Sequence, residues 1–331
     1  MKADLMKRLF RGIFSEDVVS LKKIAAQIIR DERDLGHGIL ADSLEHISVT
    51  EKPRFTVFEE KHTNGNSTGV IGLPTSKRDN SQLVSFVPRE LLKHHMVLPD
   101  DVERRLQSIE KEYAAKERLG KYNLSPKKKI LLHGTPGCGK TLSAERIAWN
   151  LGLSLLKVRF DALLSSYFGE SASNLRSVFD YCKREPVVLL LDECDFIAKS
   201  RVTAQQDVGE VPRIVNMLLT LLDEYTAPGL VIATTNLKLT LDEALFRRFD
   251  DVIEIPMPQI DEREKVLTMT LSAIPVDKSV NIHTIAEQMD GYSYANIVLT
   301  AQRAAKYSVL AGNKVVETIY FEQAIAEGSK F

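Results

Sequence analysis

Cysteine is scarce in this chain of 331 residues, which contains Cys138, Cys182 and Cys194 and no others. An odd and sparse set does not form the disulfide framework of a small secreted domain, so we expect a protein of the reducing cytoplasm. Long apolar runs are also missing, because the longest is "VVLLL" at residues 187–191. A membrane-spanning helix needs about 20 apolar residues, and the sequence therefore predicts no membrane span.

An excess of charge of either sign is absent as well. Lysine and arginine together number 44 and aspartate and glutamate 45, for a formal net charge of -1. Without a basic excess, nucleic acid is not an expected partner. The adjacent His94 and His95 have no partner at metal-ligand spacing, which argues against a zinc site.

What the chain does contain is a change of pattern along its length. Helical apolar periodicity in the first fifty residues gives way to a stretch rich in Gly, Asn, Ser and Thr, then to alternating strands and helices, and finally to helices alone. We predict a helical N-terminal arm that contacts a partner or substrate (1–49), a linker with room for one short hairpin (50–85), an α/β core (86–257) and a small helical domain (258–331).

Five short segments of the core are continuously apolar or nearly so. They are "KILLH" (129–133), "LSLLKVRF" (153–160), "VVLLLD" (187–192), "GLVIATT" (229–235) and "DVIEI" (251–255). Helical segments separate them, as in proteins whose parallel strands are covered on both faces. The sequence therefore predicts an α/β fold with a five-stranded parallel sheet between helices.

A glycine-rich loop follows the first of these strands. Gly134, Gly139, Lys140 and Thr141 match the pattern G-x-x-x-x-G-K-[ST], and a helix-forming run comes next. Backbone N–H groups of such a loop, with the positive end of the helix, bind phosphate oxygens. We expect Lys140 to contact the β- and γ-phosphates of ATP and the Thr141 hydroxyl to contact Mg²⁺. The residues expected at the nucleotide are Gly134, Thr135, Pro136, Gly137, Cys138, Gly139, Lys140, Thr141 and Leu142.

Two further strand ends carry polar side chains. In "VVLLLDECD", Asp192 and Glu193 follow a buried strand, and Asn236 follows "GLVIATT". Parallel α/β sheets bind ligands at this edge. We assign Asp192 to Mg²⁺, Glu193 to the water that attacks the γ-phosphate, and Asn236 to that water or the γ-phosphate. A single carboxylate or amide here is more often a strand exit or a turn residue, but the three motifs together indicate ATP hydrolysis.

This set resembles the AAA ATPases, the AAA subfamily of the AAA+ class, over residues from about 100 to 325. The resemblance implies a P-loop AAA+ module with a C-terminal helical lid, ATP and Mg²⁺ as cofactors, and a homo-oligomeric ring, usually a hexamer. The segment "LKLTLDEALFRRFDDVIEIPMP" is similar to the family's second region of homology. By that similarity Arg247 and Arg248 are arginine fingers that reach a neighbouring subunit's nucleotide. A short Pro-Gly insert of the family is missing, so which arginine is the principal one stays open.

Two other segments are similar to family elements. "SSYFGESASNLRSVFD" resembles the pore loop of substrate-threading members, with Tyr167 and Phe168 in the pore, although an aromatic pair on a loop can also simply pack. Residues 201–208 would belong to a second pore loop. In "MDGYSYANIVLTAQRAAKYSVL", Ala295 stands where other AAA+ clades carry a sensing arginine and would lie at the nucleotide. Tyr294 replaces the usual glycine, which puts the detail of base recognition in question.

These similarities favour an ATPase that remodels, unfolds or extracts a protein substrate through an aromatic central pore. A nucleotide-gated switch that controls a partner docked on the N-terminal arm is the alternative, and remodelling of nucleic-acid complexes is a third reading that the balanced charge disfavours. The short module is similar to small bacterial AAA proteins, some of which resemble partners of subtilisin-like proteases. A helical adaptor of microtubule- or membrane-remodelling members is equally compatible with the arm.

Overall fold

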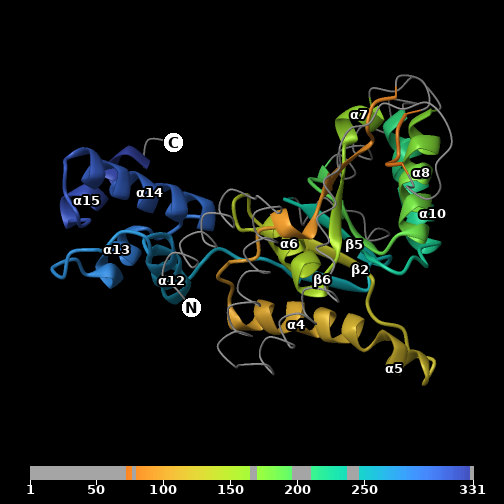
Figure 1. Ribbon diagram of the computed structural model, residues 1–331, viewed down its shortest axis with the longest axis horizontal. Coiled ribbons are helices and arrows are strands. Elements are labelled where there is room, and N and C mark those ends of the chain that lie inside the picture. Colours follow the sequence, from red (N-terminus) through yellow and green to blue (C-terminus); the bar gives the residue numbers. More distant parts are fainter. Residues whose placement is uncertain (1–71, 77–79, 165–169, 196–209, 237–245, 329–331) are drawn as a thin grey trace, which may run out of the picture. The chain divides into compact units, whose positions relative to one another are not determined.

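The computed structural model describes residues 72–76, 80–164, 170–195, 210–236 and 246–328 (Figure 1). Contacts divide the chain into two units, Met1–Val70 and Ile71–Phe331, and all described residues belong to the second. The predicted N-terminal arm and most of the predicted linker therefore lie outside the described residues. So do Tyr167 and Phe168 of the first predicted pore segment, whose later residues belong to a helix (Glu170–Arg184), and residues 201–208 of the second.

One sheet organises the second unit, with strand order β1-β3-β4-β5-β2-β6. All five predicted strands are present and parallel: β2 (Lys129–His133), β3 (Ser154–Val158), β4 (Val187–Leu191), β5 (Leu230–Thr235) and β6 (Asp251–Glu254). The expected α/β architecture with a parallel sheet between helices is confirmed.

A sixth strand, β1 (Val84–Val87), corrects the expected strand number. It pairs antiparallel with β3, which would otherwise be the edge of the sheet. An edge strand leaves a row of N–H and C=O groups to be satisfied, and β1 satisfies them. Its local signal is weak because only four residues, "VSFV", stand between a polar stretch and Pro88. The strand begins at the end of the segment that we predicted as a linker.

Helices cover both faces of the sheet and form the C-terminal region (Figure 1). The described helices are η1 (Arg89–Leu91), α4 (Asp100–Ala114), α5 (Lys116–Gly120), α6 (Lys140–Leu151), α7 (Phe160–Leu164), α8 (Glu170–Arg184), α10 (Glu210–Asp223), α12 (Ile260–Thr270), α13 (Ile282–Gln288), α14 (Tyr294–Leu310) and α15 (Thr318–Gly328). None of them is long and apolar enough to cross a bilayer.

Side-chain alternation along the strands creates two cores. In β4, Val188 and Leu190 pack in one cluster with residues of α4, α6 and the C-terminal helices. Val187, Leu189 and Leu191 point to the other face and pack with α8 and α10. Because successive side chains of a strand point to opposite faces, one continuously apolar strand supplies both cores.

The C-terminal helices are attached to the sheet domain directly above the glycine loop. Ser293 precedes α14, and its Oγ accepts a hydrogen bond from the Asn296 amide at 3.3 Å, which caps the helix. The amide of Ala295, in the first turn, donates to the Gly137 carbonyl at 3.0 Å. Because α14 starts on this loop, anything bound by the loop also lies against the lid.

Candidate functional site

The carboxyl ends of β2, β4 and β5 meet at one edge of the sheet, as their registers require. His133 pairs with Thr235, and Leu191 pairs with Ala233. A cavity of about 740 Å³ opens at this edge, between the glycine loop and α14. Of the predicted residues, Pro136, Gly137, Gly139, Lys140, Thr141, Leu142, Asp192, Glu193, Asn236 and Ala295 line it.

At two positions of the loop only glycine fits, because neighbouring atoms lie where a Cβ would be. Gly134 has φ 144°, and a Cβ there would lie 2.2 Å from the Ile255 carbonyl oxygen at the end of β6. Gly137 has φ 77°, and a Cβ there would lie 2.6 Å from Ser293 Oγ. Both positions therefore exclude a side chain for conformation and for space. The loop is held between the end of β6 and the start of α14, beside the cavity.

Lys140 begins α6 and is buried in the loop. Its Nζ donates to the carbonyls of Gly134 at 2.8 Å and Thr135 at 2.9 Å. Burial lowers the pKa of this lysine, and the nearby carboxylates Asp195 and Asp192 oppose the shift. An ammonium group placed against the loop in this way can neutralise phosphate charge inside the cavity.

Asp192 has three polar partners at the site. Its Oδ1 accepts from Thr141 Oγ1 at 2.9 Å and from Thr234 Oγ1 at 2.6 Å, and its Oδ2 pairs with Lys157 Nζ at 2.6 Å. Burial alone would raise the pKa of Asp192, but hydrogen bonds from Lys157, Thr234 and Thr141 outweigh it and lower the pKa. The side chain is therefore an ionised carboxylate beside the Thr141 hydroxyl.

Glu193 follows in an unusual backbone conformation, with φ 55°. The left-handed region costs energy for a residue other than glycine, and here the Glu193 amide is held by donating to Thr234 Oγ1 at 2.9 Å. The turn exposes the Glu193 side chain to the cavity that Asp192 also lines. Thr234 thus orients both acidic residues.

Asn236 is fixed by a residue whose role the sequence did not reveal. Asp195 accepts from the Asn236 amide nitrogen at 2.8 Å, from Asn236 Nδ2 at 2.9 Å and from Thr235 Oγ1 at 2.7 Å. Burial raises the pKa of Asp195, but these donors more than compensate and lower it. Asp195 was part of the quoted "DECD" motif, but only the pairing of β4 with β5 shows that it faces Asn236.

The cysteines near the site are buried thiols. Cys138 packs with its Sγ 3.4 Å from Met257 Sδ, and Cys194 donates to the Leu191 carbonyl at 3.2 Å. Burial raises the pKa of both thiols above the ordinary value. A protonated and buried thiol is a poor nucleophile, so these residues behave as small packing residues.

The donor set fits a nucleotide with a hard divalent cation. The loop offers amides and Lys140 for phosphate, and Thr141 and Asp192 offer adjacent oxygens, the ligands that Mg²⁺ prefers. Within the described part of the chain no group of three or more His, Cys, Asp or Glu side chains could hold a metal by itself. A cation here would therefore share its coordination shell with phosphate oxygens of the ligand, as P-loop sites do.

Comparison with known proteins identifies the family of this site. Residues 130–257 match the family model described as the ATPase family associated with various cellular activities (AAA). Over 329 residues the chain is 31% identical to a protein of Sinorhizobium fredii (strain NBRC 101917 / NGR234) named "Uncharacterized AAA family ATPase y4kL", covering 99% of this chain and 96% of the relative. The chain belongs to the AAA family of ATPases. It is an enzyme that hydrolyses ATP, as expected.

In this AAA ATPase, Arg247 and Arg248 do not lie at the nucleotide cavity. They precede β6, which runs parallel to β2, and Asp251 pairs with Ile130 near the start of β2 while Glu254 pairs with His133 at its end. The glycine loop follows the end of β2, so a strand of about 16 Å separates the arginines from it. Arg247 is exposed, and Arg248 Nε donates to Asp223 Oδ2 of α10 at 2.9 Å.

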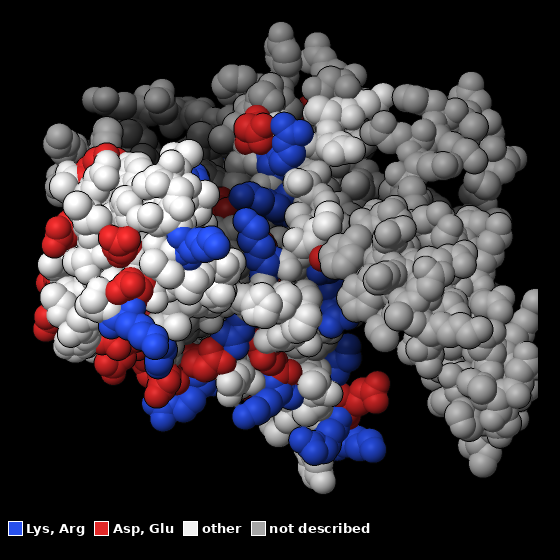
Figure 2. Space-filling model, turned by 60° about the vertical axis from the view of Figure 1, so that its left-hand side comes forward, with Lys and Arg blue, Asp and Glu red and all other residues white. Residues whose placement is uncertain are grey.

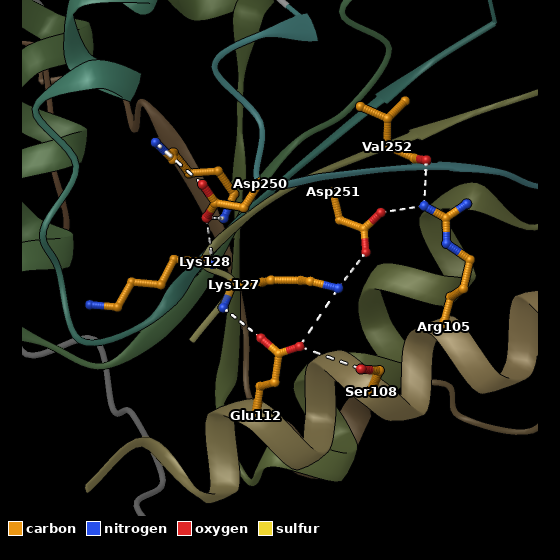
Figure 3. A network of polar contacts seen from close by, with 9 residues as sticks. Arg105, Ser108, Glu112, Lys127, Lys128, Asp250, Asp251 and Val252 are labelled. Carbon is orange, nitrogen blue, oxygen red and sulfur yellow. Dashed lines mark hydrogen bonds and ion pairs between the residues drawn. The ribbon is translucent and has the colours of Figure 1, made fainter. Parts of the chain in front are cut away.

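The segment after the arginines is anchored by two adjacent aspartates (Figure 3). Asp250 Oδ2 accepts from the backbone amides of Lys128 at 2.8 Å and Lys129 at 3.0 Å. Asp251 pairs with Lys127 Nζ at 2.9 Å and with Arg105 of α4. These bonds fix the start of β6 against the start of β2 and against α4.

Helix α4 completes this network. Glu112 accepts from the Lys127 amide at 3.0 Å, and Arg105 also donates to the Val252 carbonyl at 2.8 Å (Figure 3). On the face drawn in Figure 2, acidic and basic side chains are mixed along the lower part.

Proposed function

We propose that this AAA ATPase binds Mg²⁺-ATP in the cavity between the glycine loop and α14. The loop amides and Lys140 bind the β- and γ-phosphates, and Thr141 and Asp192 hold Mg²⁺. The metal, when bound, supplies charge neutralisation to the phosphates. The proposal is supported by the contact of Thr141 Oγ1 with Asp192 and by the convergence of these residues on one cavity.

Glu193 is the residue that orients and deprotonates the attacking water. Its exposed carboxylate borders the cavity, and its backbone is held by Thr234. Asn236, held by Asp195, helps to position that water or the γ-phosphate. A positioned general base contributes about 10²- to 10⁴-fold in rate.

Arg247 and Arg248 act in trans on the nucleotide of a neighbouring subunit. The observation that carries this part is their place before β6, at the sheet edge opposite to the cavity. Because the arginines cannot serve the cavity of their own chain from there, each active site needs a second chain. AAA ATPases often assemble into oligomers, and we propose a homo-oligomeric ring, a hexamer, for this one.

A mixing experiment tests the assignment in trans. We expect R247A/R248A to keep nucleotide binding and to lose turnover, since an arginine finger is worth about 10³- to 10⁵-fold in other nucleotide hydrolases. E193Q has intact arginines and should be inactive for a different reason. Mixed one to one and allowed to exchange subunits, the two inactive variants should recover turnover, because the arginines of an E193Q chain can complete a neighbour's Glu193-containing site.

The control is E193Q mixed with E193Q/R247A/R248A, which should remain inactive. Recovery in the first mixture alone supports action in trans. If the first mixture also stays inactive although the oligomers exchange subunits, the arginines do not act across the interface. If R247A/R248A alone turns over at the wild-type rate, they are not catalytic.

The cellular role that we propose is mechanical. Tyr167 and Phe168, which lie outside the described residues, would grip an extended protein segment in a central pore and unfold or extract it. This part rests on the sequence resemblance of "SSYFGES" alone. The rival role is a nucleotide-gated switch in which residues 1–49 bind one partner, for example an associated protease.

A substrate trap distinguishes the two roles. E193Q should bind ATP without hydrolysing it. Proteins that remain bound to E193Q with ATP present can then be isolated and identified by mass spectrometry. A heterogeneous set of proteins that is lost in E193Q/Y167A supports threading. A single stoichiometric partner that is retained in E193Q/Y167A supports the switch, and a variant lacking residues 1–49 should then release it.

A further inference from the structure

Lys157 contacts the acidic centre of the site from β3. Its Nζ lies 2.6 Å from Asp192 Oδ2, the side chain of Asp192 is 8% exposed, and that of Lys157 is 44% exposed. β3 pairs with β4 so that Lys157 lies opposite Leu190, two residues before Asp192. Neither the nucleotide-loop motif nor the acidic motif includes this lysine.

Lys157 lines a different cavity from the one at the glycine loop. Asp192 and Glu193 line two cavities, the nucleotide cavity and a second one of about 660 Å³ beside β1 and β3. Lys157 lines only the second. Its ammonium group therefore touches Asp192 without being part of the wall that meets the nucleotide.

The two oxygens of Asp192 have different partners. Oδ1 is oriented by the hydroxyls of Thr141 and Thr234, and these bonds do not involve Lys157. Oδ2 is the oxygen that pairs with Lys157. Loss of Lys157 therefore leaves the orientation of Oδ1 in place but removes the positive charge that compensates the carboxylate.

We propose that Lys157 is an internal counter-charge for Asp192 that lets the site bind a nucleoside polyphosphate with a reduced requirement for Mg²⁺. This inference rests on the proposed roles of Asp192 and the glycine loop. A polyphosphate without a cation meets repulsion from Asp192, Glu193 and Asp195. Lys157 lowers that repulsion, and it also competes electrostatically with the divalent cation, so both effects weaken the coupling between metal and nucleotide.

The measurement is the affinity of a fluorescent ADP analogue, N-methylanthraniloyl-ADP, with saturating Mg²⁺ and with EDTA. The quantity of interest is the ratio of the EDTA Kd to the Mg²⁺ Kd. For K157M we expect this ratio to increase about tenfold over the wild type, mainly because the nucleotide binds more weakly in EDTA. A tenfold change is the size expected for losing the interaction of one half-exposed unit charge. K157R keeps the charge, so its ratio should stay within about twofold.

A matched control removes an equally exposed lysine that is paired with an aspartate elsewhere. Lys183 lies on α8 and pairs with Asp180 at 2.8 Å, with both side chains 45% exposed. K183M should leave the ratio unchanged. In a D192N background, adding K157M should also leave the ratio unchanged, because the carboxylate that Lys157 compensates is gone.

The outcomes are distinct. An unchanged or smaller ratio in K157M, with far-ultraviolet circular dichroism and thermal midpoint like those of the wild type, overturns the inference, as does an equal increase in K183M. If K157M does not fold, the comparison of K157R with K157Q gives the same test. Absence of nucleotide binding by the wild-type protein contradicts the proposed site itself, a result that differs from an unchanged ratio.

Discussion

Individual side chains in this protein are held by a few short-range bonds that the chain brings together from distant positions. Thr234 is an example, since its hydroxyl donates to Asp192 and accepts from the Glu193 amide. One threonine of β5 therefore orients both acidic residues that follow β4. Such bonds matter for catalysis because a displacement of about 1 Å can cost 10²-fold in rate.

Glu193→Gln provides a test at this scale. The amide keeps the size of the side chain but cannot accept a proton from water, so we expect kcat to fall by about 10²-fold or more. The ATP Kd should stay within about threefold of the wild type, because the phosphate contacts of the loop are unchanged. Steady-state phosphate release and fluorescent-nucleotide titration measure the two quantities. A large loss of affinity would instead assign Glu193 to binding.

The two adjacent arginines should differ when changed singly. Arg248 is partly buried and pairs with Asp223, whereas Arg247 is exposed. We therefore expect R247A to lose at least about 10²-fold in kcat with an unchanged thermal midpoint. R248A should lose less turnover and lower the thermal midpoint. The reverse order in turnover would make Arg248 the principal finger.

Between elements, polar networks fix the start of β6. Asp251, the first residue of β6, joins Lys127, before β2, to Arg105 of α4 (Figure 3). At the other end of this strand, Ile255 lies against Gly134. If the start of β6 were displaced, the two arginines that precede it would be displaced as well. The network therefore links α4 to the segment that is proposed to act on a neighbour.

Asp251→Asn tests this anchor through pH. Burial raises the pKa of Asp251, but hydrogen bonds from Lys127 and Arg105 outweigh it and lower the pKa. A carboxyl with a depressed folded-state pKa stabilises the protein above its unfolded pKa, about 3.9, and this contribution is lost as pH falls through the folded value. We expect D251N to cost about 1–3 kcal/mol in the free energy of unfolding at pH 7 and at pH 5.

The difference in the free energy of unfolding between the wild type and D251N should become smaller below about pH 4. Urea unfolding at several pH values measures this difference. Asp161→Asn is the control, because Asp161 forms an exposed pair with Arg159 and should cost less than about 0.5 kcal/mol. The anchoring role would be contradicted if the difference in the free energy of unfolding stayed constant down to pH 3, or if D251N destabilised the protein no more than D161N does.

At the scale of the whole molecule, activity should depend on assembly. If the arginines complete a neighbour's site, an isolated chain has an intact nucleotide cavity but no finger. Dilution below the assembly concentration should therefore abolish turnover per chain while nucleotide binding persists. Turnover across a dilution series, compared with the mass distribution from analytical ultracentrifugation, measures this. Constant turnover per chain through dissociation would rule out a shared site.

The sequence predicted those site residues that belong to short local motifs, and it missed those whose role depends on strand pairing. The glycine loop, Asp192, Glu193 and Asn236 were predicted as site residues because each motif is short and stands at a strand end, and the structure places them around one cavity. Thr234, Asp195 and Lys157 were missed as partners because their roles depend on which strands are neighbours. The single residue Lys157 carries no local pattern at all, since a lysine in a strand is most often a solvated side chain.

The sequence by itself determined the five parallel strands, the helices between them and the glycine loop that we propose binds phosphate, because apolar periodicity and glycine conformations are local properties. Only the tertiary structure decided that β1 covers the edge of β3, that Lys157 pairs with Asp192, and that the arginines lie opposite to the cavity. Strand pairing explains this division. It joins residues that are dozens of positions apart, and the register of that pairing is set by packing of the whole sheet.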